Sequence, residues 1–133
     1  MGRPLTVQVL LDTHAFLWWL GGNRRMSGSA RRAVDDANTV FVSAASAWEI
    51  ATKHRIGKLP QAGAVALDVA GSIADQGFEE LAITVDDAER AGRLPGLHRD
   101  PFDRVLIAQA LVRDLAVVSV DRTFDGYGVR RLW

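Results

Sequence analysis

The chain has 133 residues, of which 48% are apolar and 24% charged, with 16 basic residues, 16 acidic residues and no cysteine. This length and apolar fraction fit one globular domain over residues 1–133 and exclude a disordered chain, because enough apolar surface is available to form a core. No apolar run approaches the roughly 18 residues that cross a bilayer, so we expect no membrane association. The lack of cysteine excludes a disulfide scaffold and a cysteine-ligated zinc site, and we expect a cytoplasmic protein.

The first third of the chain predicts a strand followed by two helices. Residues 6–11 form a short apolar run that ends at Asp12, which is typical of a buried strand with a polar group at its carboxyl end. An aromatic-rich helix is predicted over 14–20. A second helix is predicted to begin at Ser27 or Ser29, because serine is a good N-cap residue.

The middle of the chain repeats the strand–helix order. Residues 39–42 predict a second strand, and Ser43 follows it in N-cap position for a helix over 44–55. One further helix is predicted over 65–74 from its apolar residues. Residues 78–84 then predict a third strand.

Two helix starts are marked by capping residues in the next part of the chain. Thr84 and Asp87 are spaced as in a capping box, which predicts a helix over 86–94. Asp100 is followed by a proline and a second acid, which predicts a helix that runs through Leu111. That helix is apolar on most sides, so we expect it to be deeply buried.

The last part of the chain predicts a fourth strand over 115–120 and a short fifth strand over 129–133 at an edge of the sheet. Strands that alternate with helices imply right-handed crossovers. The sequence therefore predicts the α/β class, with a central parallel sheet of four to five strands covered by helices on both faces.

Four acidic residues are placed to meet at one edge of this sheet. Asp12 ends the first strand, Asp121 follows the fourth, and Glu49 and Asp103 lie in the predicted helices around 44–55 and after Asp100. Ligands bind beyond the carboxyl ends of parallel strands. Carboxylates about 5 Å apart repel by roughly 3 kcal/mol per pair at an effective dielectric constant near 20, so this group needs a cation or bound protons. An all-oxygen acidic site favours Mg²⁺ or Mn²⁺ over zinc.

Each of these acids also has a purely structural explanation. Asp100 and Asp103 are residues that helix capping alone would select, and Asp121 is a typical first residue of a turn. Glu49 can pair with Lys53 four residues later in the same helix. Asp12 is the least explained by structure, because a charge directly after an apolar strand must be matched by another group.

Four segments of the chain, taken in order and with their spacing, resemble the successive motifs of PIN-domain ribonucleases. They are Leu10-Leu11-Asp12-Thr13-His14, Ser43-Ala44-Ala45-Ser46-Ala47-Trp48-Glu49-Ile50, Asp100-Pro101-Phe102-Asp103-Arg104 with Leu106-Ile107-Ala108-Gln109-Ala110, and Ser119-Val120-Asp121. Within that family the chain is most similar to the VapC-type toxins of bacterial toxin–antitoxin pairs. The resemblance covers nearly the whole chain, and the ordered set is more specific than any single motif.

The resemblance implies a single three-layer α/β/α domain whose acidic pocket binds Mg²⁺ or Mn²⁺ and cuts single-stranded or loop RNA. By position, Asp12, Glu49, Asp103 and Asp121 match the catalytic metal-binding acids of the family, with Asp100 as an accessory metal ligand.

Other positions receive supporting roles from the same resemblance. Thr13 and Ser119 stand where the family has small hydroxyl residues beside its metal ligands, and His14 is assigned to packing or support of the pocket. Such toxins are usually homodimers that are held inactive by a cognate antitoxin, which lays a helix or an extended tail across the toxin. The aromatic segment 16–20 is open to three interpretations: core, which is expected for at least half of it, a dimer face, or a groove for the antitoxin.

The available chemistry points to water activated by a metal ion. The chain has no cysteine nucleophile, no Ser/His/Asp arrangement and no P-loop glycine pattern. A metal ion can lower the pKa of bound water and stabilise the charge that develops on a phosphate. Arg104 and Arg122 neighbour predicted metal ligands and are the expected contacts to RNA phosphates.

Three other functions stay open from the sequence. One is a PIN-like domain without catalysis that serves as an RNA-binding or interaction module, and another is a structure-specific DNA nuclease with the same chemistry. The third is a receiver-type signalling domain, which would need a phosphoacceptor aspartate at the end of the third strand and a lysine after the fifth. Here the predicted third strand ends at Thr84, and no lysine follows Lys58.

Overall fold

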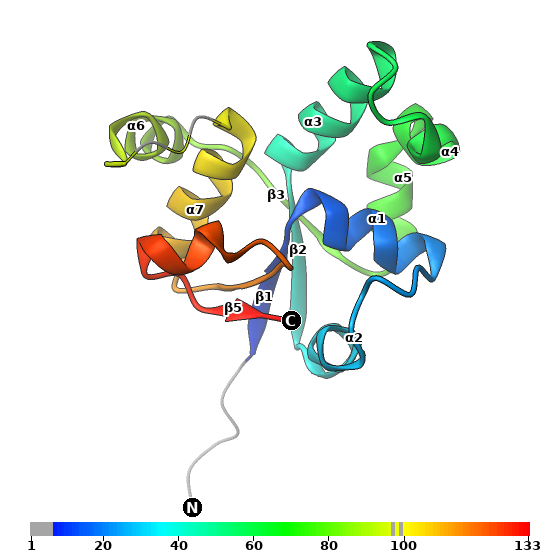
Figure 1. The fold of residues 1–133 in the computed structure, drawn as a ribbon, viewed down its shortest axis with the longest axis horizontal. Coiled ribbons are helices and arrows are strands. Elements are labelled where there is room, and N and C mark those ends of the chain that lie inside the picture. The colour runs from blue at the N-terminus through cyan, green and yellow to red at the C-terminus, as the bar shows by residue number, and fades with distance from the viewer. Residues whose placement is uncertain (1–6, 97, 99) are drawn as a thin grey trace, which may run out of the picture.

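A computed structural model describes residues 7–96, 98 and 100–133 (Figure 1). In this part of the chain, five strands form one parallel sheet in the order β3-β2-β1-β4-β5. The strands are β1 (Gln8–Leu11), β2 (Thr39–Ser43), β3 (Glu79–Leu81), β4 (Ala116–Val118) and β5 (Arg131–Leu132). The predicted parallel sheet is therefore confirmed, with β1 in its centre.

Seven α-helices and two 3₁₀ helices connect the strands within the described residues. They are α1 (Thr13–Gly21), α2 (Gly28–Asp36), α3 (Ala44–Arg55), η1 (Pro60–Ala62), α4 (Gly63–Leu67), α5 (Val69–Asp75), α6 (Val85–Arg93), α7 (Pro101–Arg113) and η2 (Arg122–Tyr127). Figure 1 shows α1, α2, α4 and α5 on one side of the sheet and α6, α7 and η2 on the other. This arrangement confirms the three-layer α/β/α architecture.

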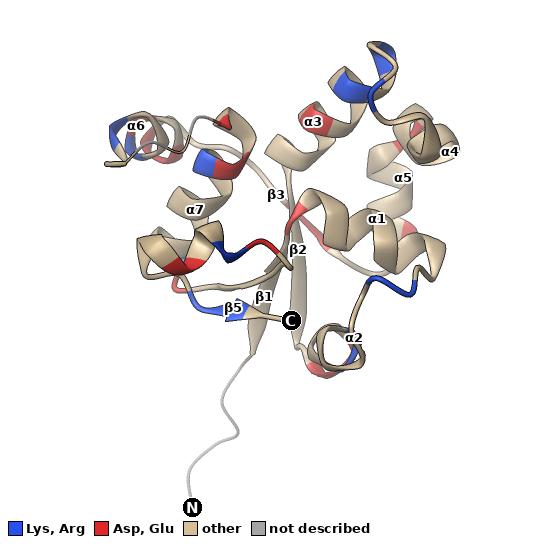
Figure 2. Ribbon diagram, viewed as in Figure 1, with Lys and Arg blue, Asp and Glu red and all other residues tan. Residues whose placement is uncertain are grey.

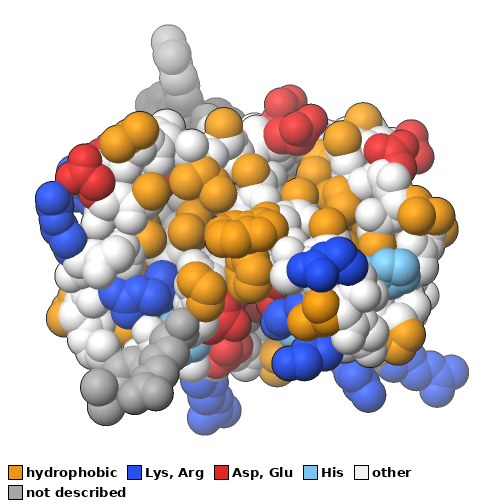
Figure 3. Space-filling model, turned by 90° about the horizontal axis from the view of Figure 1, so that it is seen from above, with side chains coloured by type: hydrophobic (Ala, Val, Ile, Leu, Met, Phe, Trp, Pro, Cys, Tyr) orange, Lys and Arg blue, Asp and Glu red, His pale blue; other side chains and the backbone are white. Residues whose placement is uncertain are grey.

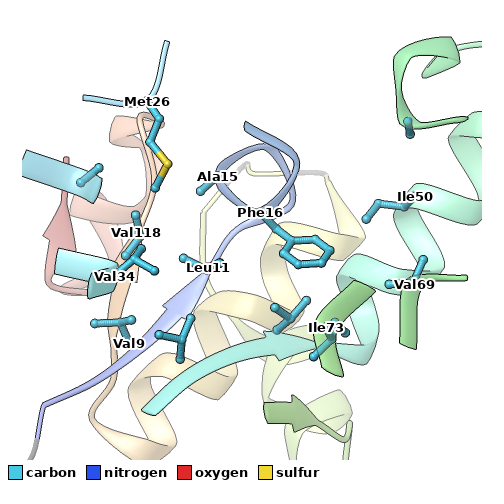
Figure 4. Packing of buried hydrophobic residues seen from close by; sticks show 14 of the residues in the cluster. Val9, Leu11, Ala15, Phe16, Met26, Val34, Ile50, Val69, Ile73 and Val118 are labelled. Atoms are coloured by element: carbon cyan, nitrogen blue, oxygen red, sulfur yellow. The ribbon is translucent and has the colours of Figure 1, made fainter. Parts of the chain in front are cut away.

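The central strand is buried on both faces, as expected for a covered parallel sheet. Val9 and Leu11 point into the core beneath α1 and α2, whereas Leu10 points into the core beneath α7. All three side chains are fully buried. Figure 4 shows Leu11 of β1 near Phe16 of α1 and Val118 of β4, so the first core joins elements from both ends of the chain.

The predicted capping residues begin their helices as expected. Ser27, rather than Ser29, caps α2 through a hydrogen bond from Ala30 N (3.0 Å), and Ser43 caps α3. Thr84 and Asp87 form the predicted capping box of α6.

One prediction about the helices was wrong, and another was confirmed for only part of its helix. The single helix expected over 65–74 is split into α4 and α5, because Asp68 leaves the helical conformation (φ −155°, ψ 76°) and caps α5 by accepting from Gly71 N. Helix α7 is buried over 106–110, as expected, but the side chains of Leu111 and Val112 are 45% and 43% exposed. These two side chains line a hollow between α7 and α6.

The predicted third and fourth strands, 78–84 and 115–120, are shorter in the structure, where β3 and β4 have three residues each. The predicted first strand begins at Thr6, which lies outside the described residues. In the described part of the chain, no helix has the length and apolar character needed to span a membrane.

A buried ion pair joins α6 to α7. Asp87 is inaccessible to solvent and accepts two hydrogen bonds from the guanidinium of Arg113 (2.9 and 3.0 Å) and one from Gln109 Nε2 (3.2 Å). Burial raises the pKa of Asp87, but the hydrogen bonds from Arg113, Thr84 N and Gln109 outweigh it and lower the pKa to about 2. The ionised carboxylate therefore stabilises the fold.

This ion pair gives a pH-dependent prediction. The pKa of Asp87 is lower in the folded state than in the unfolded state, so its contribution is complete above about pH 4 and is lost as the pH falls towards 2. We expect Asp87→Asn to reduce the free energy of unfolding by about 2–3 kcal/mol at pH 7, since each pKa unit corresponds to about 1.4 kcal/mol. The free energy of unfolding of both proteins, measured with urea at pH 7 and at a series of lower pH values, checks this prediction.

The matched control is Asp86→Asn at the neighbouring position, where the carboxylate is exposed and pairs with the exposed Arg90. We expect little change there, because surface ion pairs contribute little to stability. An Asp87→Asn effect that stays constant as the pH falls through 4 to 2 would contradict the assigned role of the charge.

Candidate metal and active site

The carboxylates predicted to meet at the carboxyl edge of the sheet line one pocket of about 500 Å³. They are Asp12 after β1, Glu49 in α3, Asp100 and Asp103 at the start of α7, and Asp121 after β4. Acidic segments of these elements converge above the sheet in Figure 2. Figure 3 looks onto this edge and shows acidic side chains in a recess with basic side chains on either side.

Asp12 uses its two carboxylate oxygens for different purposes. Oδ1 accepts from Ala15 N (2.8 Å) and thereby caps α1, and Oδ2 accepts from the hydroxyl of Ser119 (2.5 Å). The chain continues directly from β1 into α1, so this capping bond fixes the side chain at the end of the central strand. The sequence indicated that the charge of Asp12 must be matched by another group. In the structure this carboxylate accepts hydrogen bonds from one backbone N–H and one hydroxyl.

Ser119 connects two of the acids. Its Oγ donates to Asp12 and accepts from the backbone N–H of Asp121 (2.9 Å). Asp121 Oδ1 in turn accepts from the backbone N–H (2.9 Å) and hydroxyl (2.6 Å) of Thr123. Burial raises the pKa of Asp121, but these bonds to Thr123 outweigh it and lower the pKa. Asp121 thus starts the turn into η2 and faces the pocket at the same time.

Glu49 is buried and has a partner on each carboxylate oxygen. The hydroxyl of Thr13 donates to Oε1 (2.5 Å) and lies 3.0 Å from Oγ of Ser46. The ammonium of Lys53, one turn further along α3, donates to Oε2 (2.5 Å). Although partial burial lowers the pKa of Lys53, its bond to Glu49 more than offsets this and the pKa is raised. The expected Glu49–Lys53 pair is present, and it lies in the pocket.

Asp100 and Asp103 lie together in the first turn of α7. Asp100 Oδ1 accepts from the backbone N–H groups of Phe102 (2.9 Å) and Asp103 (3.2 Å), so it caps the helix as predicted. Asp103 Oδ2 lies 3.1 Å from Nε2 of His98. Asp100 therefore has the structural role that capping predicted, and it also faces the pocket.

The pocket carries excess negative charge. Burial, with smaller contributions from Glu49 and Asp121, raises the pKa of Asp12 to about 6 against the hydrogen bonds from Ser119 and Ala15. Burial and the charge of Asp100 raise the pKa of Asp103 to about 6 as well. Five carboxylates face two permanent cations, Arg25 and Lys53, among the lining residues. Such an arrangement favours a bound cation.

The pocket is not preformed as a metal cage. Within residues 7–96, 98 and 100–133, no three acidic or histidine side chains converge closely enough to enclose an ion. The carboxylates are held instead by Ser119, Thr13, Lys53 and His98. The donor set nevertheless fits Mg²⁺ or Mn²⁺, because it consists of hard carboxylate oxygens in a site with excess negative charge.

The two predicted RNA contacts differ in their surroundings. The guanidinium of Arg104 donates to the backbone carbonyls of Ala91 (2.9 Å), Leu94 (2.5 Å) and His98 (2.9 Å), and so it fastens the end of α6 and the following loop to α7. Because the guanidinium N–H groups already bind backbone carbonyls, we do not include Arg104 among the proposed RNA contacts. Arg122 is exposed at the start of η2 and is kept.

The structure also brings residues to the pocket that the sequence did not single out. His98 reaches Asp103 from the loop before α7, and Arg25 lines the pocket from the segment after α1. Trp18, which belongs to the aromatic segment 16–20, lines the pocket from α1. His14 is exposed at the pocket instead of packed in the core. The positions of His98 and Arg25 depend on how loops fold back, so sequence spacing gave no indication of them.

Comparison with known proteins places these features in context. Residues 9–129 match the model of the PIN domain family. Ribonuclease VapC22 of Mycobacterium tuberculosis is 31% identical over 115 residues, which cover 86% of this chain and 87% of that protein.

Two solved structures share the fold. VapBC2 from Rickettsia felis, bound to a DNA fragment from its promoter, has a TM-score of 0.68 at 14% identity and covers 94% of this chain and 97% of that chain. Mycobacterium tuberculosis VapC20, a sarcin–ricin loop cleaving toxin, has a TM-score of 0.63 at 17% identity and covers 91% and 95%.

The raised pKa of Asp103 yields a prediction about stability without metal. Its folded-state pKa of about 6 lies above the unfolded value, so the ionised form costs stability, and this cost grows as the pH rises from about 4 to above 6. We expect Asp103→Asn to be more stable than the wild type at pH 7 in EDTA by about 1–2 kcal/mol, after allowance for partial exposure. Thermal unfolding at pH 7 and pH 5 measures both the gain and its decrease at the lower pH.

Asp36→Asn, at an exposed position in α2, is the control for a change of net charge alone. If Asp103→Asn were less stable than the wild type at pH 7 in EDTA, the contact between Asp103 and His98 would stabilise the fold by more than the neighbouring carboxylates destabilise it. Asp103 would then not belong to a repulsive cluster.

Proposed function

This chain belongs to the PIN domain family, and we propose that it is a metal-dependent endoribonuclease that acts as the toxin of a toxin–antitoxin pair. The observation that carries the proposal is the acidic pocket at the carboxyl edge of the sheet, where Asp12 and Asp103 have pKa values raised to about 6. A relative of 31% identity is named as a ribonuclease, which supports the reaction class.

The carboxylates would hold Mg²⁺ or Mn²⁺ at this pocket. The ligands are Asp12, Glu49, Asp103 and Asp121, with Asp100 as an accessory ligand. When bound, such an ion lowers the pKa of water and neutralises the charge that develops on the scissile phosphate.

The protein's own groups keep the carboxylates in place for this purpose. Ser119 and the helix cap at Ala15 fix Asp12, and the hydroxyl of Thr13 fixes Glu49. Each of these donors is a neutral hydroxyl or backbone N–H, so it orients a carboxylate without cancelling its charge. Such pre-positioning is typical of groups around a metal site.

Lys53 is the exception, because it is charged and bonded to Glu49. Its ammonium balances part of the negative charge in the absence of a divalent ion. A bound ion and Lys53 would then compete for the same carboxylate, and an RNA phosphate is an alternative partner for the displaced ammonium.

The partners follow from the family and from the structural neighbours. Solved structures with this fold include toxin–antitoxin complexes from Rickettsia felis and Salmonella typhimurium, each bound to DNA. We infer a cognate antitoxin protein and a homodimer for this chain as well, with single-stranded or loop RNA as substrate. A receiver-type signalling domain is no longer a candidate, because residues 9–129 belong to the PIN family.

The direct test of catalysis replaces two of the acids. We expect Asp12→Asn and Asp103→Asn to reduce Mn²⁺-dependent cleavage of single-stranded RNA by about a hundredfold or more, since even residues that only support metal ligands commonly contribute 10–100-fold. Asparagine keeps the capping oxygen of residue 12, so the fold is retained. Gel analysis of a labelled RNA and circular dichroism of each variant measure the two effects.

Asp36→Asn serves as the control and should cleave like the wild type. Full metal-dependent activity in Asp12→Asn would reject the assignment of the site. The deoxy form of the same oligonucleotide separates a ribonuclease from a DNA nuclease, and binding of RNA without any cleavage in Mg²⁺ or Mn²⁺ would favour the non-catalytic module.

Lys53 provides a test of metal binding that needs no substrate. We expect Lys53→Met to be less stable than the wild type in EDTA, because Glu49 loses its counter-charge, and to gain more stability from millimolar Mn²⁺, because the ion no longer competes with the ammonium. Thermal unfolding with EDTA and with Mn²⁺ gives both quantities. Lys58→Met, at an exposed position beyond α3, is the matched control.

A Mn²⁺ stabilisation of Lys53→Met that equals or falls below that of the wild type would show that Lys53 does not compete with the ion for Glu49.

A further inference from the structure

A second hollow adjoins the acidic pocket and is not explained by the proposed chemistry. This hollow, which we call the α1 groove, has a volume of about 800 Å³. One face of α1 forms its first wall, and residues of η1 and α4 form the opposite wall. The residues used below are His14, Leu17, Trp18, Arg25, Gln61 and Val65.

The wall formed by α1 follows from helical spacing. His14, Leu17 and Trp18 stand at positions i, i+3 and i+4, so they share one face of the helix. Ala15 and Phe16 are buried on the other side in the core. His14 is exposed, whereas Leu17 and Trp18 are half-buried and pack against the edge of the core. This face of α1 therefore presents two aromatic rings to the groove at the border of the core.

The aromatic rings of this wall are held by their neighbours. The ring centroids of His14 and Trp18 are 5.8 Å apart, and those of Trp18 and Trp133 are 5.7 Å apart. Trp133 lies beyond β5, so a segment distant in sequence helps to hold the Trp18 ring in place. A braced, partly exposed ring is a suitable surface for stacking, because little side-chain freedom is lost when a planar ligand binds.

Arg25 stands where the α1 groove meets the acidic pocket. Its side chain is exposed, and its Cζ lies 5.9 Å from the centroid of the Trp18 ring, near the outer limit of a cation–π contact. A guanidinium in this position can move from the ring to a phosphate, to which it binds more strongly through paired hydrogen bonds. That movement also exposes the face of the ring.

The α1 groove and the acidic pocket are continuous. His14, Trp18 and Arg25 line both. A nucleic acid strand with one phosphate at the carboxylates must leave the pocket past other carboxylates, which repel its next phosphate. Arg25 supplies positive charge on the side that leads into the groove, and the rings of Trp18 and His14 lie directly beside it.

We propose that the α1 groove binds the nucleotide next to the scissile phosphate of a single-stranded RNA, with its base stacked on Trp18 and His14 and its phosphate bound by Arg25. This inference rests on the proposed function, since it assumes that the scissile phosphate lies at the acidic pocket. An exposed base is required, so paired bases inside a duplex cannot enter. Gln61 lines the opposite wall, and its amide can hydrogen bond to the edge of a base. Val65 adds an apolar side chain to the same wall.

The experiment measures binding of a fluorescein-labelled hexanucleotide RNA in Ca²⁺, in wild type and four variants. Stacking on an aromatic side chain contributes about 1–3 kcal/mol per base, so Trp18→Leu should weaken binding by about 5- to 150-fold. Trp19→Leu is the matched control, because Trp19 is the next residue of α1, is also partly buried, and packs on Phe78 away from both hollows. It should bind as the wild type does.

Arg25→Ala tests the groove through an exposed residue whose replacement leaves the core intact. It should weaken binding and lower the slope of log affinity against log salt by about one, as expected for one lost phosphate contact. Arg24→Ala, the exposed neighbour that lines neither hollow, is its control and should leave that slope unchanged.

A series of hexanucleotides with one base removed at each position identifies the stacked base. In wild type, one position should show a loss of affinity similar to that of Trp18→Leu, and in Trp18→Leu this loss should disappear. Equal affinities of Trp18→Leu and Trp19→Leu, or a base-removal penalty that persists in Trp18→Leu, would overturn the proposal and leave the groove to a protein segment. Equal affinity for duplex RNA would also overturn it.

The outcomes separate this inference from the proposed function. Normal RNA binding in Trp18→Leu and Arg25→Ala, together with metal-dependent cleavage by the wild type, rejects the groove and retains the ribonuclease. A wild type that neither binds nor cleaves RNA rejects both.

Discussion

The hydrogen bond from Ser119 to Asp12 is the contact on which the candidate site depends. It joins the ends of the two adjacent strands β1 and β4, and through the backbone of Asp121 it connects a second carboxylate to the same hydroxyl. Buried carboxylates repel one another, so they stay together only where the fold holds each of them from behind. Helix caps and hydroxyl groups supply that support to Asp12 and Asp121 without neutralising their charge, whereas Glu49 is also paired with Lys53.

Much of the fold was predictable because its elements are marked by local chemistry. The apolar run before Asp12 and the caps at Ser43, Thr84 and Asp100 each gave an element that the structure contains. The errors have local causes as well. Asp68 interrupts a helix that apolar spacing alone predicted to be continuous, since an aspartate side chain is favoured at an N-cap over a helix interior.

The candidate site was predictable to the extent that it follows from the order of strands. Asp12 and Asp121 end up together because parallel strands present their carboxyl ends at the same edge, and Glu49 and Asp103 face that edge from the helices beside it. Residues whose place depends on loop paths were not predictable in this way. Arg104 neighbours a predicted ligand in sequence, yet its guanidinium points to the carbonyls at the end of α6, whereas Arg25 reaches the pocket from 13 residues beyond Asp12.

The distance along the chain between Ser119 and Asp12 has a consequence for synthesis of the protein. The two residues are 107 positions apart, and β4 enters the sheet beside β1 only after every preceding element has been made. A growing chain on the ribosome therefore carries Asp12, Glu49 and Asp103 but lacks the segment that fixes Asp12 and adds Asp121. The complete set of acids, with Asp12 fixed in place, therefore exists only after the chain has been made through Asp121.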